Sequence, residues 1–374
     1  MKIGIDARGI NFYKGTGIGT YTENLLRCLL NIDRDNYYHI YWWGENHNEF
    51  KKNNSKITFT SKKNKNFFEN HYFSNSISTE GIDLYHVPQN GIGLHQDITC
   101  KKIITIHDLI PYIMPETVGK GYLNKFLKEL PNLIDNCDAI LTVSEWSKKD
   151  IAKFFPKFDP EKIFVTPLAA DSKYRPIDKD KCKYILKKFY NITKPFILYI
   201  GGFSPRKNVH SLITAFSKVF NRLNGEYELV IVGANKDNGE SLLNMSNNMD
   251  IKDRIVFTGF VPESHLPLFY NGCDLFVYPS LYEGFGLPPL EAMSCGTPVI
   301  SSNLSSIPEV VEDGGILIDP YDEKLLEIMI EKTLGDITFQ NSLKEKAIKR
   351  ASLFSWTETA RKTLDAYNKT YNDI

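Results

Sequence analysis

The sequence predicts an α/β protein made of two similar halves, each built on a parallel β-sheet. Short apolar runs alternate with amphipathic helical patterns along the chain, which is typical of repeated βα units. The 374 residues are enough for two domains. A stretch at 167–176, with two prolines among polar residues, reads as a linker between the two series. Because ligands bind at the carboxyl ends of parallel strands, two facing sheets predict a central cleft.

The first half contains seven strand candidates and four helical patterns. The strands are expected at Lys2–Asp6, Tyr38–Trp43, Ile57–Thr60, Leu84–Val87, Ile103–Ile106, Ala139–Val143 and Ile163–Thr166. The helices are expected near 18–31, 66–77, 119–135 and 146–155.

The second half repeats the pattern and ends in a long amphipathic segment at about 338–372. Its strands are expected at Phe196–Ile200, Glu228–Val232, Ile255–Thr258, Leu275–Tyr278, Pro298–Ser301 and Gly315–Ile318. Its helices are expected near 206–222, 240–248, 263–271, 288–295, 306–312 and 322–335.

Composition excludes several classes of protein. Hydrophobic residues make up 42% and the formal net charge is zero, which weighs against a nucleic-acid binder. No apolar run approaches the length of a membrane span, and the charged N-terminus does not resemble a signal peptide. The six scattered cysteines predict reduced thiols in a cytoplasmic protein. Basic pairs such as Lys51-Lys52, Lys62-Lys63 and Lys101-Lys102 indicate solvated surface, and a peripheral contact with the inner membrane surface stays open.

The stretch KGTGIGTYTENLL at 14–26 is a glycine-rich loop that leads into a helix. It lacks the lysine of a P-loop. The spacing of Gly15, Gly17 and Gly19 also differs from the dinucleotide-binding fingerprint, so the sequence argues against a dehydrogenase. Glycines let a ligand approach the backbone, and a helix N-terminus offers free N–H groups to an anion. A tight turn without a ligand is the alternative.

A second candidate site follows the first strand of the second half. Gly201 and Gly202 allow a sharp turn, after which Arg206 and Lys207 are expected at the start of a helix. The helix dipole disfavours two cations at that position, so an anion such as a diphosphate is expected to neutralise them. An exposed basic turn is the alternative.

The segment YEGFGLPPLEA at 282–292 is the most informative stretch. Glu283 is expected in a loop after a strand, and Glu291 in the opening turns of a helix that begins at Pro288 and Pro289. Two carboxylates near one strand end can accept hydrogen bonds from sugar hydroxyls. A hydrolase with paired carboxylates, or a helix-capping role for Glu291, remains open.

These residues resemble the family 4 retaining GT-B glycosyltransferases. The resemblance rests on Glu-x7-Glu (Glu283 and Glu291), on Arg206-Lys207 and on the glycine loop. It extends to His107-Asp108-Leu109, to VSEWSK at 143–148, to SSIPEVVEDGG at 305–315 and to Trp356, and it spans essentially the whole chain.

The resemblance implies a GT-B architecture of two Rossmann-like domains. Residues 1–170 would form the acceptor-side domain, residues 171–355 the donor-side domain, and residues 356–374 a helix that crosses back to the first domain.

The resemblance also implies site roles. Arg206 and Lys207 would bind the donor diphosphate, and Glu291 the ribose. Glu283 and His107 would face the donor sugar, so the expected catalytic residues are His107, Glu283, Arg206 and Lys207. The remaining expected donor-binding residues are Gly15, Gly17, Gly19, Phe260, Val261, Gly284, Phe285, Gly286 and Leu287.

Several of these residues also have structural interpretations. His107 is equally suited to capping neighbouring backbone. Asp6 and Arg8 fit either the acceptor side or an ion pair, and Ser144 with Ser147 fits helix capping.

The expected function is transfer of a hexose, with mannose favoured, from GDP-mannose or a UDP-sugar to a glycan or lipid-linked glycan in surface polysaccharide synthesis. No metal and no other cofactor is expected, because cations and N–H groups can stabilise the leaving diphosphate. The oligomeric state is left open. The alternatives are a transferase that uses a UDP-sugar of glucose, GlcNAc or galactose, a GT-B nucleotide-sugar epimerase, and a non-catalytic sugar- or nucleotide-binding module.

Overall fold

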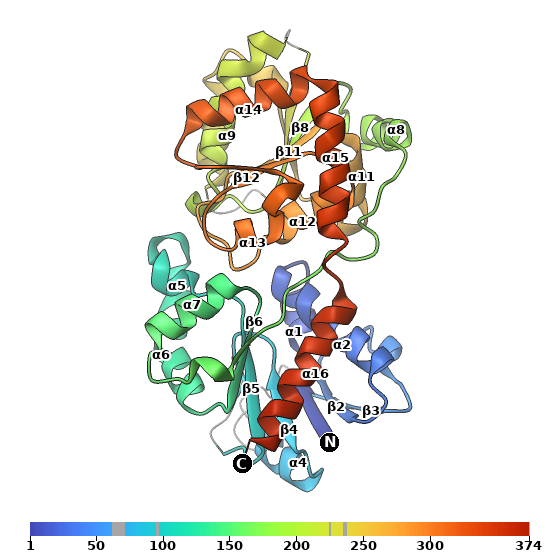
Figure 1. Ribbon diagram of the computed structural model, residues 1–374, viewed down its shortest axis with the longest axis vertical. Helices are drawn as coiled ribbons and strands as arrows, with labels where there is room; N and C mark the ends of the chain where they lie inside the picture. Colours follow the sequence, from blue (N-terminus) through green and yellow to red (C-terminus); the bar gives the residue numbers. More distant parts are fainter. Residues whose placement is uncertain (62–71, 95–96, 224–225, 235–237, 374) are drawn as a thin grey trace. The chain divides into compact units, whose positions relative to one another are not determined.

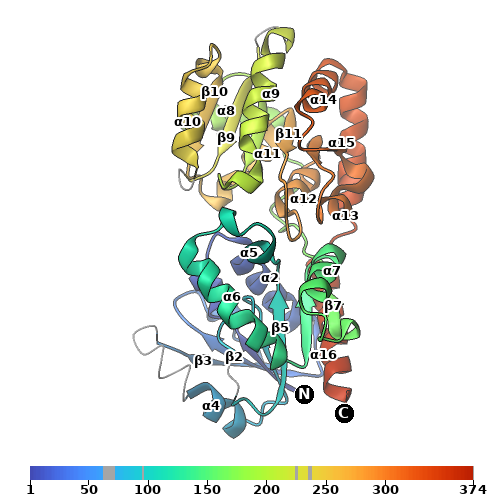
Figure 2. The same cartoon turned by 90° about the vertical axis from the view of Figure 1, so that its left-hand side faces the viewer.

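The computed structural model describes residues 1–61, 72–94, 97–223, 226–234 and 238–373, and these contain two parallel sheets flanked by helices (Figures 1 and 2). The chain divides into two compact units. Unit 1 comprises Met1–Pro115, Gly119–Leu168 and Ser355–Ile374, and unit 2 comprises Glu116–Val118 and Ala169–Phe354. The sequence analysis set these divisions after 170 and after 355, without the short segment 116–118.

Unit 1 contains a sheet of seven strands in the order β3-β2-β1-β4-β5-β6-β7. The strands are β1 (Lys2–Asp6), β2 (Tyr37–Trp42), β3 (Ser55–Phe59), β4 (Leu84–Val87), β5 (Lys101–Ile106), β6 (Ala139–Thr142) and β7 (Ile163–Val165). The strand order reverses between β1 and β4, so the loops that follow these strands border the crevice where such sheets bind ligands. Central strands such as β4 are buried along their whole length, as expected for a sheet covered on both faces.

The helices of unit 1 pack against this sheet. The described α-helices are α1 (Gly9–Phe12), α2 (Gly17–Ile32), α4 (Phe73–Thr79), α5 (Ile110–Ile113), α6 (Lys120–Asp135), α7 (Glu145–Phe154) and α16 (Trp356–Asn372). Short 3₁₀ helices lie at η1 (Asn48–Phe50), η3 (Pro115–Thr117) and η4 (Pro160–Lys162). Of the helix expected at 66–77, the part before 72 lies outside the described residues.

Helix α16 packs beside α2 in unit 1 (Figure 1). The hydroxyl of Tyr367 lies 2.7 Å from Nδ1 of His86 on β4, and Thr359 donates to the carbonyl of Pro167. Nε2 of His86 contacts Thr105 on β5, and Thr105 in turn contacts Tyr21 on α2. The last helix is therefore joined to the middle of the first sheet through buried polar side chains.

Unit 2 contains a sheet of six strands in the order β10-β9-β8-β11-β12-β13. The strands are β8 (Phe196–Ile200), β9 (Glu228–Val232), β10 (Ile255–Gly259), β11 (Leu275–Tyr278), β12 (Val299–Ser302) and β13 (Ile316–Ile318). Here the order reverses between β8 and β11. The candidate residues 206, 207, 283 and 291 all follow these two neighbouring strands, so they belong to one edge of the sheet.

The described α-helices of unit 2 are α8 (Lys179–Tyr190), α9 (Val209–Val219), α10 (Gly239–Asn247), α11 (Leu266–Gly272), α12 (Leu287–Ser294), α13 (Ile307–Val311), α14 (Glu323–Gly335) and α15 (Ile337–Ala351). Short 3₁₀ helices lie at η5 (Pro205–Lys207), η6 (Phe220–Leu223), η7 (Lys252–Arg254), η8 (Glu263–His265) and η9 (Glu312–Gly314).

Three expected helices are divided in the structure. The helix expected at 206–222 begins as η5, and Asn208, with φ of 53°, separates it from α9. The helix expected at 263–271 consists of η8 followed by α11. The segment expected at 338–372 ends at Ala351 and restarts at Trp356, because Ser355 accepts a hydrogen bond from the backbone of Glu358 and so caps a new helix.

None of the helices in the described ranges combines the length and the apolar character needed to cross a bilayer.

Candidate functional site: the carboxyl edges of the two sheets

The three glycines of the loop at 14–26 differ in what a side chain at each position would meet. Gly15 adopts φ of 78°, which a side chain would strain. A Cβ at Gly19 would lie 2.4 Å from the carbonyl oxygen of Tyr13, so the start of α2 can pack there only with glycine. Gly17 has neither constraint: no atom lies within 4 Å of the position that its Cβ would take. The position of a Cβ at Gly15 is equally open, so Gly15 and Gly17 both leave room for the close approach of a ligand, whereas Gly19 does not.

His107 follows β5 and is fixed at both its backbone and its ring. Its backbone N–H donates to Oδ1 of Asn90 at 2.9 Å, and its Nε2 lies 2.8 Å from the carbonyl oxygen of Pro88. A carbonyl can only accept, so Nε2 carries the proton and Nδ1 is the basic nitrogen. Burial lowers the pKa of His107 to about 4, although the bond to Pro88 opposes this shift. The imidazole is therefore neutral at pH 7.

The structure supports the capping interpretation of His107 and adds partners that sequence analysis missed. Pro88 and Asn90 lie in the loop after β4, and Asn90 has a φ of 50°. Ser147 donates from its hydroxyl to the carbonyl of His107, while Ser144 caps α7 by accepting from the backbone of Ser147. The capping role expected for Ser144 is confirmed.

Asp6 and Arg8 form a buried ion pair at the end of β1. Nε of Arg8 lies 2.8 Å from Oδ1 of Asp6, and Nη2 lies 2.7 Å from Oδ2. Gln89 donates to the same carboxylate at 2.7 Å, a contact that the sequence gave no sign of. Of the two interpretations left open, the structure shows the ion pair.

In unit 2, Arg206 and Lys207 both contact the carboxylate of Glu283. Nη1 of Arg206 lies 3.0 Å and Nζ of Lys207 lies 2.6 Å from Oε1 of Glu283. All three side chains are largely buried. The two cations do not lie at the start of α9, as expected, but in η5 before Asn208. The carboxylate of Glu283 pairs with them there, so the helix dipole gives no reason to expect an external anion.

Two further hydroxyls contact the same oxygen of Glu283. The hydroxyl of Tyr278 lies 3.0 Å and that of Ser280 lies 2.5 Å from Oε1. Burial alone would raise the pKa of Glu283, but Lys207 and Arg206 outweigh it and lower the pKa to about 2. Sequence analysis missed Tyr278 and Ser280, although they lie just before Glu283.

The loop from Gly284 to Leu287 is held by backbone contacts. The hydroxyl of Ser306 lies 2.9 and 2.8 Å from the carbonyl oxygens of Glu283 and Phe285. Gly286 adopts φ of 114° at the start of α12. The ring of Phe285 packs against Phe354 inside unit 2, so it belongs to the core and only its backbone borders the loop.

Glu291 lies in α12, as expected, but among aromatic side chains. The hydroxyl of Tyr270 donates to its Oε2 at 2.9 Å, and the ring of Tyr174 lies edge-on to Tyr270. Burial raises the pKa of Glu291 to about 7, and the bond from Tyr270 opposes this shift. The helix-capping alternative is wrong, because the backbone of Gly286 occupies the cap position and Glu291 lies in the middle of the helix.

Phe260 and Val261 follow β10 and differ in exposure. The side chain of Phe260 is 79% exposed, whereas Val261 is buried. An exposed aromatic ring after a strand end is a suitable surface for stacking a nucleobase.

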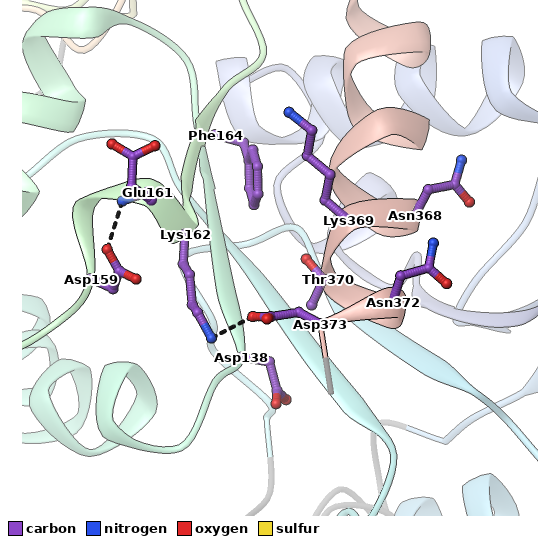
Figure 3. Close-up of a pocket in the computed structure, with 10 residues that line it drawn as sticks. All are labelled: Asp138, Asp159, Glu161, Lys162, Phe164, Asn368, Lys369, Thr370, Asn372 and Asp373. Carbon is purple, nitrogen blue, oxygen red and sulfur yellow. Dashed lines mark hydrogen bonds and ion pairs between the residues drawn. The ribbon is translucent and has the colours of Figure 1, made fainter.

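A cavity of about 650 Å³ in unit 1 lies at the other edge of the sheet (Figure 3). Its wall includes Asp138, just before β6, and Lys162, just before β7. Lys162 is paired with Asp373 at 2.6 Å. The end of α16 supplies the other side of the cavity, from Asn368 to Asp373. The cavity therefore lies at the amino ends of β6 and β7, separate from the candidate residues, which follow the carboxyl ends of strands.

Within the described ranges, no group of three or more His, Cys, Asp or Glu side chains has an arrangement suited to a metal ion. The carboxylate of Glu283 is held by two cations instead.

The comparisons with known proteins agree with this arrangement. Residues 183–350 match the family model "Glycosyl transferases group 1". O-antigen chain mannosyltransferase B of Escherichia coli is 34% identical over 267 residues, which cover 71% of this chain and 70% of that protein. The serotype-specific mannosyltransferase WbdA of the same species is 31% identical over 278 residues; these cover 73% of this chain but only 34% of that longer protein.

A solved structure shows the same fold. The crystal structure of Anabaena Alr3699/HepE in complex with UDP and glucose superposes with a TM-score of 0.77 at 17% identity, and the match covers 99% of this chain and 100% of that one. The chain has two Rossmann-like sheets, and in unit 2 Arg206 and Lys207 follow one strand while the Glu-x7-Glu segment follows the neighbouring strand. O-antigen chain mannosyltransferase B matches more than two thirds of this chain and of its own length. The chain therefore belongs to the group 1 glycosyl transferases, in their mannosyltransferase-like, GT-B group.

Proposed function

We propose that this glycosyltransferase moves a mannosyl residue from GDP-mannose to a glycan or lipid-linked glycan during surface polysaccharide synthesis, with retention of configuration and without a metal ion. The two relatives described above are named mannosyltransferases, one of them an O-antigen chain enzyme, and this supports both mannose and the polysaccharide. The main support for a donor-binding site is that the side chains of Arg206 and Lys207 both contact Glu283.

The charge balance around Glu283 favours a diphosphate. Two cations surround one carboxylate whose pKa of about 2 keeps it ionised, so the group carries one net positive charge at pH 7. A diphosphate brings at least two negative charges to a partly buried position, where electrostatic attraction is stronger than in bulk water. When the sugar–phosphate bond breaks, negative charge grows on the leaving oxygen. The same two cations would stabilise it, which is the role that a metal ion has in other enzymes.

Glu291 and Phe260 would bind the nucleoside. An ionised Glu291 can accept hydrogen bonds from both ribose hydroxyls, while the exposed ring of Phe260 would stack on the base. The backbone at Gly284 and Gly286, at the start of α12, would face the donor sugar.

His107 and the glycine loop are proposed to act on the donor from unit 1. Because Nε2 of His107 is bound to Pro88, Nδ1 is the nitrogen that would accept a hydrogen bond from a sugar hydroxyl. Gly15 and Gly17 are the positions in the loop where a phosphate could approach the backbone. The six cysteines are free thiols, which agrees with the proposed cytoplasmic location.

The test begins with thermal unfolding in the presence of GDP, UDP, ADP or NAD at equal concentration. A ligand at 100 times its Kd stabilises the folded state by about 2.7 kcal/mol, which gives a clear rise in Tm. We expect the largest rise with GDP, followed by transfer from GDP-mannose to a mannose-terminated acceptor and an α-linked product by NMR. A rise with UDP alone would replace GDP-mannose by a UDP-sugar. No response to any nucleoside diphosphate would contradict the donor site.

A further inference from the structure

The ring of Tyr21, on α2, packs directly against the imidazole of His107. The two ring centroids lie 4.9 Å apart and the ring planes meet at 87°, an edge-to-face contact. Tyr21 is fully buried, and its hydroxyl lies 3.2 Å from Oγ1 of Thr105, two residues before His107. One tyrosine therefore contacts His107 with its ring and the strand that carries His107 with its hydroxyl.

This contact supplies a restraint on His107 that the bond to Pro88 does not supply. That bond holds Nε2, but rotation of the ring about its Cβ–Cγ bond displaces Nδ1 more than Nε2. The torsion of a histidine ring about this bond has broad minima, so the direction of Nδ1 depends on what packs against the ring. A hydrogen bond weakens steeply when it is misaligned, so a ring plane held by Tyr21 keeps Nδ1 correctly directed.

Helix α16 contacts Tyr21 by two routes. The ring of Trp356, at the start of α16, lies 6.3 Å from the ring of Tyr21. The second route is a chain of buried polar side chains: Oγ1 of Thr105 lies 2.7 Å from Nε2 of His86, and Nδ1 of His86 lies 2.7 Å from the hydroxyl of Tyr367. The position of Tyr21 is therefore tied to the packing of α16.

The charge state of this chain favours a positional role over proton transfer. Burial raises the pKa of Tyr21 to about 12, although hydrogen bonds to Thr105 and Thr166 oppose the shift. Burial lowers the pKa of His86 to about 3, and the nearby imidazole of His107 adds to the shift. Both side chains are neutral at pH 7, so they hold neighbouring groups in place without exchanging a proton with solvent.

We propose that Tyr21 is a positioning residue for His107. Helix α16 in turn holds Tyr21, directly through Trp356 and indirectly through the polar chain that ends at Tyr367. The inference rests on the proposed function, in which Nδ1 of His107 faces the donor sugar. It assigns to the last helix a part in the reaction that no contact with the donor requires.

The first test compares Tyr21→Leu with Tyr21→Phe in steady-state transfer. Leucine removes the flat ring and should lower kcat by about tenfold or more, because a misdirected imidazole loses its contact in the transition state. The KM for the donor should stay within about twofold, since the cations that bind the diphosphate are untouched. Phenylalanine keeps the ring and should restore most of kcat.

The matched control for the ring is Tyr41→Leu. Tyr41 lies on β2 of the same unit, is also fully buried, and its hydroxyl also lies 3.2 Å from another hydroxyl, that of Ser76. Its ring packs with Tyr85, whose neighbour His86 points to the opposite face of the sheet. Tyr41→Leu should therefore destabilise the fold but leave kcat unchanged.

The polar route through α16 has its own pair of variants. Tyr367→Phe removes the hydroxyl that contacts His86 and should lower kcat several-fold, less than Tyr21→Leu does. Tyr41→Phe removes one buried hydroxyl from the other face of the sheet and should have no effect on kcat. Circular dichroism of each variant checks that it is folded.

NMR of labelled histidine rings tests the geometry without substrate, and His107→Gln identifies the signal. In the wild type and in Tyr21→Phe, the His107 ring should give one neutral tautomer with the proton on Nε2; in Tyr21→Leu the signal should shift or broaden. An unchanged signal in Tyr21→Leu, or an equal loss of kcat in Tyr21→Leu and Tyr41→Leu, overturns the proposal. If the wild type transfers no sugar, the proposed function fails, and the His107 signal by itself decides whether Tyr21 positions the ring.

Discussion

Glu283 and Glu291 are eight residues apart, follow the same strand and are both buried, yet their surroundings push their pKa values in opposite directions. The loop around Glu283 supplies Lys207 and Arg206, which overcome burial and lower its pKa to about 2. Glu291 in α12 instead has as neighbours Tyr270 of α11 and Tyr174 of the segment before α8, which carry no positive charge, and burial raises its pKa to about 7.

A sequence motif therefore specifies which residue types are present, whereas the side chains around each residue determine whether it is charged. Glu283 is ionised at any physiological pH and holds two cations in place. Glu291 exists in both forms near neutral pH, so a ligand that prefers the ionised form must displace a proton.

The largest effect is expected from removing the cations beside Glu283. Arg206→Ala with Lys207→Ala should reduce transfer at least 100-fold, about 2.7 kcal/mol of activation free energy, because no charge remains to stabilise the leaving diphosphate. Steady-state kinetics would measure it, with circular dichroism to check folding and Lys346→Ala/Lys349→Ala as the matched control. Near-normal turnover in a folded variant would contradict the diphosphate site.

The next effect concerns the stability that Glu283 provides. Its folded pKa lies below the unfolded value of 4.5, so this stability is complete above pH 4.5 and is lost as the pH falls through 2. Glu283→Gln should lower the free energy of unfolding by about 2 kcal/mol at pH 7, and by less at pH 3. Urea titrations at both pH values, with the surface variant Glu323→Gln as control, measure the difference. An equal loss at both pH values would show that charge is not the cause.

Glu291 should behave in the opposite way. Its folded pKa lies above 4.5, so its contribution to stability is complete below pH 4.5 and is lost as the pH rises through 7. Glu291→Gln should therefore raise the free energy of unfolding by about 1–2 kcal/mol at pH 8 and change it little at pH 5. The same variant should bind GDP at least tenfold more weakly by calorimetry. Stabilisation without loss of GDP binding would remove the ribose assignment.

A smaller effect is expected in the pH dependence of nucleotide binding. If ribose requires ionised Glu291, GDP affinity should be flat above pH 8 and fall by up to about tenfold per pH unit below 7. The Glu291→Gln variant supplies the control, because it retains the titration of GDP itself. Identical pH profiles for the two proteins would show that Glu291 does not titrate on binding.

The smallest effect is expected from removing metal ions. Treatment with EDTA should leave the transfer rate within about twofold, since Arg206 and Lys207 are proposed to stabilise the leaving group themselves. The rate after addition of Mg²⁺ to the treated enzyme is the comparison. Complete loss with recovery on Mg²⁺ would mean that a ligand set has been overlooked.

Much of the fold could be predicted because parallel strands are short, apolar and bounded by turn residues. β1, β4, β8, β9 and β11 have the bounds that the sequence predicts. The predicted helix boundaries were wrong where single residues end or start a helix. Asn208, in the left-handed conformation, divides η5 from α9, and Ser355 caps the start of α16. Neither event changes the hydrophobic period from which helices are predicted.

The candidate site was predictable in its residue types but not in its pairings. Arg206, Lys207 and Glu283 are found together because β8 and β11 are neighbours, which strand order alone decides. That the cations bind Glu283, and that Tyr270 donates to Glu291, depends on tertiary contacts between residues far apart in sequence. The roles of Gly17, Phe260 and His107 toward a donor stay predictions.

The return of α16 to unit 1 has a consequence for biosynthesis. A ribosome completes all of unit 2 before it releases the helix whose Tyr367 bonds to His86 in the centre of the first sheet. Until then, the nascent first domain exposes the side of α2 that α16 covers, and Nδ1 of His86 lacks the hydroxyl of Tyr367. The order of translation therefore makes unit 2 the first to mature, and makes unit 1 the natural client of a chaperone during synthesis.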